Sequence, residues 1–207
     1  MSLNKFTNPT LYQPWMSFSM NELTVKELNV DGFKPMVLKF TKITNTTVQN
    51  TSLEENLVTT NDGVGSLLLQ ANSLKVGDTG RLKLSGIFSA VLSASVTFRF
   101  FYGPSSNVFA SSLSLTPLPI TVGAGFELDF NFTVKQLGPS GTGLIQMMTY
   151  FKTNQFVNLA DYSILESSFD SANFDTTVNN VFAVTVDYGS ASPDNSITCN
   201  QATFVMS

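Results

Sequence analysis

The chain has 207 residues, a net charge of −4 and no histidine. The lack of histidine removes the side chain most used for acid–base chemistry near neutral pH and the commonest metal ligand. The 11 Lys and Arg residues are scattered singly, whereas nucleic-acid binding depends on grouped cations that release counterions, so no nucleic-acid partner is expected. The composition favours a protein that works through its surface and shape rather than through catalysis.

The sequence predicts neither membrane insertion nor oxidative folding. No stretch approaches the roughly 18 consecutive apolar residues that a membrane-spanning helix needs, and the first residues lack the apolar core of a signal peptide. The lone cysteine, Cys199, cannot form an internal disulfide and is interpreted as a small hydrophobic residue on a strand. We therefore expect synthesis and assembly in the cytoplasm, without secretion through a signal peptide.

Residues 1–35 differ from the rest of the chain and are predicted to form an extended segment with short β repeats. Within residues 21–32, two units of the pattern x-Leu-x-Val are each too short to bury an apolar face alone. Packing against copies in neighbouring chains would stabilise them, which indicates an oligomerisation element; a single hairpin of the main domain is the alternative. The predicted interface residues are Leu23, Val25, Leu28 and Val30.

Trp15 is the single tryptophan of the chain and lies between Pro14 and Met16. A lone exposed tryptophan can anchor a binding partner. We favour a plug that caps the domain or contacts a neighbouring subunit over a role in ligand binding.

From Met36 onward, apolar and polar residues alternate in short segments separated by Gly, Pro, Asn and Asp, which predicts an antiparallel all-β sandwich over residues 36–207. The clearest strand is Phe126–Val134, and Leu74–Asp78 is predicted as a turn. Leu159–Phe169 is the only segment predicted as a short helix. The other predicted strands are Met36–Ile43, Ser66–Gln70, Thr79–Ser89, Ser95–Tyr102, Leu144–Phe151, Asn179–Tyr188 and Ser196–Met206.

No catalytic or metal-binding constellation is predicted. Without histidine, neither a Ser-His-Asp triad nor a histidine zinc site can form. Glu127 and Asp129 lie on the outward face of one predicted strand, where we interpret both as solubilising residues rather than as a glycosidase pair. Glu54 and Glu55 are interpreted in the same way. The loop aspartates lack the spacing of a calcium loop, so no metal and no cofactor are expected.

The stretch Asn72–Gly86, NSLKVGDTGRLKLSG, resembles a turn and strand of a jelly-roll-like domain found in structural proteins of double-stranded DNA viruses and tailed phages. A strand at Ser95–Phe101 and the regions Leu128–Thr142 and Val184–Cys199 match that pattern in order and spacing. The segment Lys26–Gly32 is similar to the short β repeats that introduce viral fibre heads and minor capsid components. The likeness covers most of the chain.

The resemblance implies a jelly-roll subunit of a capsid, vertex or fibre, located in the virion and forming a homotrimer that contacts other capsid proteins. It assigns no catalytic residue and implies a turn role for Gly77 and Asp78. The alternative is a host-attachment or lectin-like module that binds a host surface glycan through loops at one end of the sandwich. Those loops are Gly103–Asn107, Gly138–Gly143 and Gly189–Asn195.

Overall fold

The computed structural model describes residues 36–104, 108–115, 120–153, 163–171 and 174–207, with backbone alone for 108–111 and 163–171. These residues form strands, turns and a short 3-10 helix, η2 (Thr60–Asp62). The strands of the first half are β1 (Val37–Lys42), β2 (Thr46–Gln49), β3 (Glu55–Val58), β4 (Gly63–Gly65), β5 (Leu68–Leu69), β6 (Thr79–Ala90) and β7 (Val96–Tyr102). The strands of the second half are β8 (Val108–Leu115), β9 (Thr121–Gln136), β10 (Leu144–Thr153), β11 (Ser163–Ser171), β12 (Asn180–Val181), β13 (Ala183–Tyr188) and β14 (Ser196–Met206).

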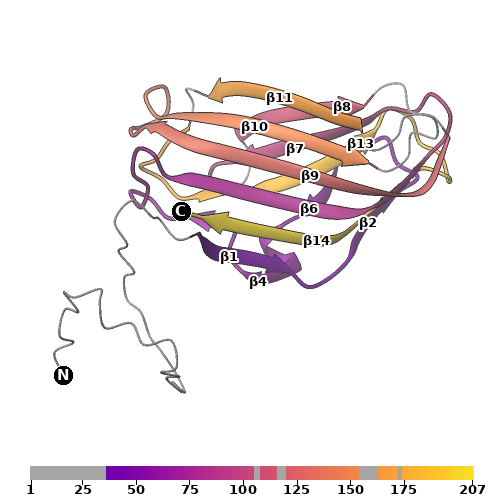
Figure 1. Ribbon diagram of the computed structural model, residues 1–207, viewed down its shortest axis with the longest axis horizontal. Coiled ribbons are helices and arrows are strands. Elements are labelled where there is room, and N and C mark those ends of the chain that lie inside the picture. The colour runs from indigo at the N-terminus through magenta and orange to yellow at the C-terminus, as the bar shows by residue number, and fades with distance from the viewer. Residues whose placement is uncertain (1–35, 105–107, 116–119, 154–162, 172–173) are drawn as a thin grey trace, which may run out of the picture. The chain divides into compact units, whose positions relative to one another are not determined.

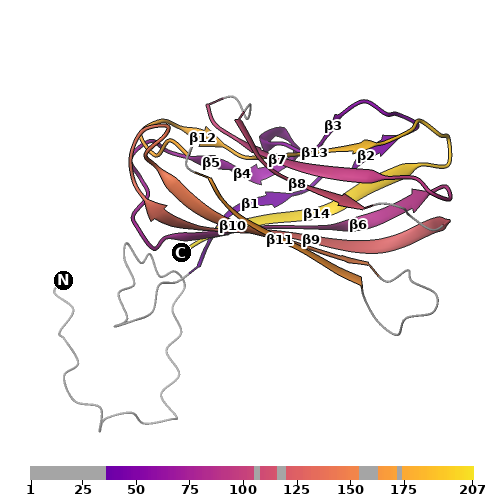
Figure 2. The same ribbon diagram turned by 90° about the horizontal axis from the view of Figure 1, so that it is seen from above.

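Two antiparallel sheets face each other and enclose the core (Figures 1 and 2). The larger sheet has the order β11-β10-β9-β6-β14-β1-β4, with β2 also paired to β14, and the smaller sheet has the order β3-β13-β7-β8. The pairing of the main strands is nested in sequence, so that the first pairs with the last and strands nearer the middle of the chain pair with each other. The pairs are β1 with β14, β3 with β13, β6 with β9, and β7 with β8. The predicted all-β sandwich of two antiparallel sheets is therefore confirmed.

The alternating sequence pattern determines which side chains fill the space between the sheets. Along β9, the residues from Phe126 to Val134 at every second position are at most 3% exposed, as predicted. On β6, Leu82, Leu84 and Phe88 are buried in the same way. Full burial of one such side chain contributes about 1.5–3 kcal/mol, so this row of residues is a main source of stability.

Aromatic rings from the two sheets meet directly in the core. Phe100 of β7 and Phe130 of β9 stack with ring centroids 4.3 Å apart and an interplanar angle of 16°. Phe98 of β7 lies with its ring centroid 5.9 Å from Phe126 of β9 and 5.6 Å from Phe151 of β10. Because β7 belongs to the smaller sheet and β9 and β10 to the larger one, these ring contacts fix how the two sheets pack on each other.

Every strand predicted from the sequence overlaps an observed strand, but the predicted helix at Leu159–Phe169 is wrong. The described part of this segment lies in β11, which pairs antiparallel with β10 from Thr153↔Ser163 to Ile145↔Ser171. A neighbouring strand that offers a complete hydrogen-bond ladder outweighs weak local helix propensity. Strands β2, β4, β8 and β11 were not predicted, because their sequences carry no clear alternation of apolar and polar residues.

The turn before β6 matches its prediction. Gly77 has a φ of 90°, a conformation that glycine adopts without steric cost. The Oδ2 atom of Asp78 accepts a hydrogen bond of 2.7 Å from the backbone N–H of Lys75. Both residues therefore act in the turn.

A buried lysine ties together the elements that follow β1. The side chain of Lys42 is fully buried, and its Nζ donates a hydrogen bond of 2.7 Å to Thr46 Oγ1 and lies 3.4 Å from Asp62 Oδ2. The same Asp62 oxygen accepts hydrogen bonds from the backbone N–H and the hydroxyl of Thr59, at 2.7 and 3.1 Å. Since a buried charge is costly unless it is paired, these contacts anchor η2 to β1 and β2.

Truncation of the stacked ring of Phe130 tests the role of the inter-sheet contacts. Phe130→Ala should lower the free energy of unfolding by about 3–5 kcal/mol, because it removes a fully buried ring and leaves a cavity. Chemical denaturation measures this change. Val76→Ala, at a position that is 60% exposed, is the control and should stay within about 0.5 kcal/mol of the original protein. A loss below about 1 kcal/mol for Phe130→Ala would contradict this role.

Candidate functional surfaces

The residues predicted to form the oligomer interface and the plug lie outside the described residues. They are Trp15, Leu23, Val25, Leu28 and Val30. Their roles stay predictions.

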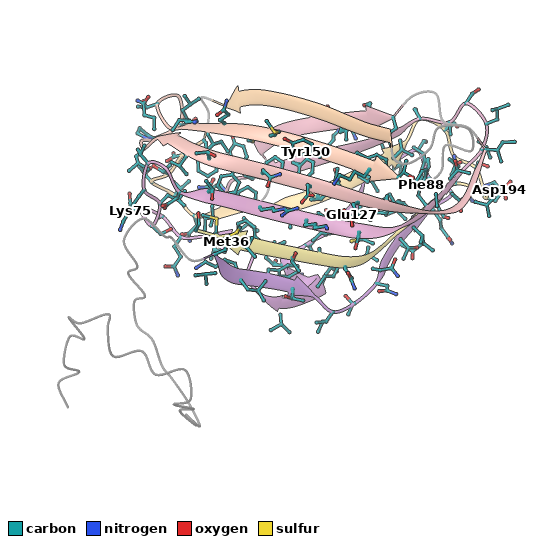
Figure 3. The ribbon with its side chains drawn as sticks, in the orientation of Figure 1. Met36, Lys75, Phe88, Glu127, Tyr150 and Asp194 are labelled. Carbon is teal, nitrogen blue, oxygen red and sulfur yellow. The ribbon has the colours of Figure 1, made fainter. Side chains whose placement is uncertain are left out.

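Two ion pairs occupy the outer face of the larger sheet, where Figure 3 labels Glu127 and Tyr150. The guanidinium of Arg81 on β6 donates hydrogen bonds to both carboxylate oxygens of Asp129 on β9, at 2.7 and 2.9 Å. Lys83 Nζ lies 3.2 Å from Glu127 Oε2. The hydrogen bond to Asp129 raises the pKa of Arg81. Each pair spans neighbouring strands of the sheet.

These ion pairs correct one of the sequence interpretations. Glu127 is half exposed, as expected of a solubilising residue, but Asp129 is only 6% exposed and holds a bidentate arginine. The interpretation of Asp129 as solubilising is therefore wrong. A charged group of this kind is tolerated inside a protein because a geometrically matched partner compensates its desolvation. Both carboxylates thus take part in contacts that link β6 to β9.

Cys199 is a buried residue of β14, as its sequence context indicated. Burial raises the pKa of its thiol to about 12, although the nearby charge of Lys42 acts in the opposite direction. The thiolate is the reactive form of cysteine. At neutral pH this side chain therefore stays protonated and behaves as a small hydrophobic group.

Alkylation measures the protection of this thiol. In the native protein at pH 8, iodoacetamide should modify Cys199 at least about 100 times more slowly than in the unfolded chain, because the native thiol is buried and its pKa is raised. Mass spectrometry over a time course gives both rates. Equal rates would show that the residue is accessible and the assignment wrong.

The three loops predicted to form one binding end do not lie together. Gly103 follows the last residue of β7, and its carbonyl accepts a hydrogen bond from the backbone N–H of Val181. Gly189 instead donates its backbone N–H to the carbonyl of Ser95, which directly precedes β7. Figure 3 shows Asp194, in the loop after Gly189, and Lys75 at opposite ends of the sandwich. The prediction of a shared binding end is therefore wrong, because successive antiparallel strands place their connections at alternating ends.

The outer face of the smaller sheet carries a groove of about 310 Å³, called here the sheet groove. Its floor includes Phe101 of β7 and Ala183 and Thr185 of β13. Phe101 and Ala183 lie directly opposite each other in the ladder between these strands. Because the methyl group of alanine is small, the floor is hollow beside the half-buried phenylalanine ring. The residues along its sides are Glu54, Asn56, Thr59, Thr60, Val181 and Phe182.

The carboxylate of Glu54 is held in place at the side of the sheet groove. Its Oε1 atom accepts a hydrogen bond of 2.5 Å from the hydroxyl of Thr185, and its Oε2 atom lies 3.6 Å from Arg99 Nη1. Arg99 also forms an ion pair with Asp187. The sequence interpretation of Glu54 as a solubilising residue missed this arrangement, because its partners are 45 or more positions away in the sequence and only the β-ladders bring them together.

Apolar side chains are exposed along the edge formed by β1 and β4, called here the apolar edge. Leu38, 59% exposed, lies opposite Val205 of β14. Val64, 65% exposed, lies opposite Thr41 of β1. Both side chains share the outer face of the larger sheet, and Figure 3 labels Met36 where β1 begins. The residues of the apolar edge are Met36, Val37, Leu38, Ile43 and Val64.

A second exposed apolar surface lies at the end of the sandwich that carries Asp194. Leu92, Ile120 and Val122 are exposed there around a hollow of about 410 Å³. Clusters of this kind on a folded surface mark contacts with other molecules more often than isolated apolar residues do.

In the described part of the chain, no helix has the length and apolarity to cross a membrane. Within the same residues, acidic and cysteine side chains do not gather into a group of three or more that could hold a metal ion.

Comparisons with known proteins give little further information. No protein-family model matches the chain, and no curated protein matches it. Among solved structures, the chain is similar to the CBM2 module of the evolved Dit of Lactobacillus casei BL23 phage J-1, with 12% sequence identity and a TM-score of 0.32. The alignment covers 67% of this chain and 66% of that one, just under two thirds of its length.

Proposed function

We propose that the chain is a structural subunit of a virus particle that assembles with copies of itself and with other capsid proteins. The antiparallel two-sheet sandwich supports this proposal, because the jelly rolls of capsid subunits and lectins have the same two-sheet architecture. A fold alone does not specify a function. The observation that carries the assembly part of the proposal is the apolar edge, where five large apolar side chains are each at least 50% exposed.

The geometry of β1 favours contact through side chains over addition of a further strand. The ladder between β1 and β14 is irregular between Leu38 and Phe40, so Lys39 is the extra residue of a β-bulge. Bulges and lysines on edge strands oppose pairing with strands of other molecules. Strand β4 already covers β1 at Phe40–Lys42. A neighbouring subunit would therefore pack against the apolar side chains.

The proposed assembly has two levels. The N-terminal residues Leu23, Val25, Leu28 and Val30 join chains into a homotrimer, and the apolar edge joins trimers to neighbouring subunits in the virion. The proposed role is not enzymatic. The engagement of Asp129 by Arg81 and of Glu127 by Lys83 supports that view, because a glycosidase needs a carboxyl group free to exchange a proton with its substrate.

A charge change in the N-terminal element tests the trimer. The full chain should sediment as a trimer, and Leu28→Asp combined with Val30→Asp should sediment as a monomer, because burying unpaired carboxylates in an apolar contact is costly. Asn29→Asp places a single charge between the two positions and is the matched control. A monomeric original protein, or a trimer that survives the double substitution, would contradict the proposed interface.

A charge change at the apolar edge tests the association between trimers. Leu38→Asp combined with Val64→Asp should leave the trimer intact but raise the concentration at which larger species form by about tenfold or more, which corresponds to about 1.4 kcal/mol. Light scattering over a concentration series measures this shift. Leu53→Asp, at a position that is 71% exposed outside the apolar edge, should have little effect. An equal effect of both changes would indicate general repulsion instead of a specific contact.

A further inference from the structure

We propose that the sheet groove is a binding site for a short, neutral saccharide. Glu54 and Asn56 would hydrogen-bond the hydroxyl groups of the sugar, and Phe101 would pack against the apolar face of its ring. This inference goes beyond assembly, and it places recognition on the smaller sheet instead of on the loops at the ends of the sandwich.

The polar groups of the groove match the mixed hydrogen-bonding character of a sugar. Glu54 has two acceptor oxygens, and the hydroxyl of Thr185 occupies only part of their capacity. Within the described residues, no side chain hydrogen-bonds the amide of Asn56, which offers both donors and an acceptor at the exposed side of the groove. Hydroxyl groups donate and accept hydrogen bonds, so a ligand rich in them can engage both side chains at once.

The carboxylate is already positioned for such a contact. Thr185 holds one oxygen of Glu54 from the floor, and Arg99 lies near the other oxygen. A side chain that is held before binding loses less conformational entropy when the ligand arrives. Thr59, another residue of the lining, is itself held by Asp62, which pairs with the buried Lys42. Two polar residues of the lining are therefore held in place before a ligand binds.

The apolar part of the groove is suited to the face of a sugar ring. Phe101 is half buried and adjoins the small side chain of Ala183, so the ring borders a hollow of the floor. Val181 also belongs to the lining, whereas the ring of Phe182 packs in the core against Phe132 and Phe204. Small-molecule sites typically begin at volumes of about 300 Å³. The volume of about 310 Å³ matches a short saccharide better than a long chain.

The charges of the groove select against anions and strong cations. No lysine or arginine belongs to the described lining, and Glu54 is its one charged member. An anionic sugar would therefore find no salt-bridge partner in this lining. Arg99 lies 3.6 Å from Glu54 and offsets its charge, which weakens the attraction for a cation. A neutral ligand fits this balance.

The experiment uses the full chain and a glycan array that carries both neutral and sialylated saccharides. Neutral glycans should bind and sialylated ones should not. The methyl glycoside or disaccharide corresponding to the strongest neutral signal is then titrated by calorimetry. Asn56→Ala and Phe101→Ala should each weaken binding about tenfold, and Glu54→Gln about fivefold or more, because each removes a direct contact. Sedimentation of every variant should match that of the original protein, which separates binding from assembly.

The matched control is Glu55→Gln, the same chemical change at the next residue, which is outside the lining of the groove. It should alter the dissociation constant by less than about twofold. Asn56 and Glu54 are exposed, so their substitutions keep the test decisive even if Phe101→Ala fails to fold. The proposal would be overturned if no neutral glycan bound, or if all the groove variants still bound the glycan. It would also be overturned if the protein bound the cation tetramethylammonium but no saccharide.

Discussion

The contact between phenylalanine rings of the two sheets is the constraint on which the other features depend. Phe100 and Phe130 stack across the interior, and Phe98 meets Phe126 and Phe151. Successive side chains of a strand point to opposite faces of the sheet. Because the even-numbered residues Phe98 and Phe100 of β7 point inward, its odd-numbered residues point outward. Arg99 and Phe101 therefore face the outer surface of the smaller sheet, where one holds Glu54 and the other lines the groove. The surface chemistry follows from the packing of the core.

The sequence predicted those parts of the fold that local alternation determines. The strand at Phe126–Val134 lies within β9, and Ser196–Met206 coincides with β14. The helix prediction failed at β11, where pairing with β10 decides the structure. Asp129 was misinterpreted because its partner Arg81 is 48 residues away in sequence. The groove had no sequence signal at all, since it needs the ladders of β3, β13 and β7 to bring its residues together.

The proposed recognition and assembly surfaces share one structural element. Residues Thr60–Asp62 of η2 lead directly into β4, so Thr60 lines the sheet groove and Val64 belongs to the apolar edge. The ion pair of Lys42 with Asp62 lies between them and holds η2 against β1. A movement of η2 would affect both surfaces. The two proposed surfaces are therefore connected through η2.

The position of β14 has a consequence for how the protein is made. This strand comes after every other described strand in the chain, yet it lies inside the larger sheet between β1 and β6. Until it emerges from the ribosome, β1 lacks its long ladder and β2 lacks its partner in the sheet. The hairpin of β7 and β8 can form from local contacts, whereas the sandwich closes only after β14 has been synthesised. Chains that lack β14 would expose the apolar interior, so loss of these 11 residues should be far more damaging than their small number suggests.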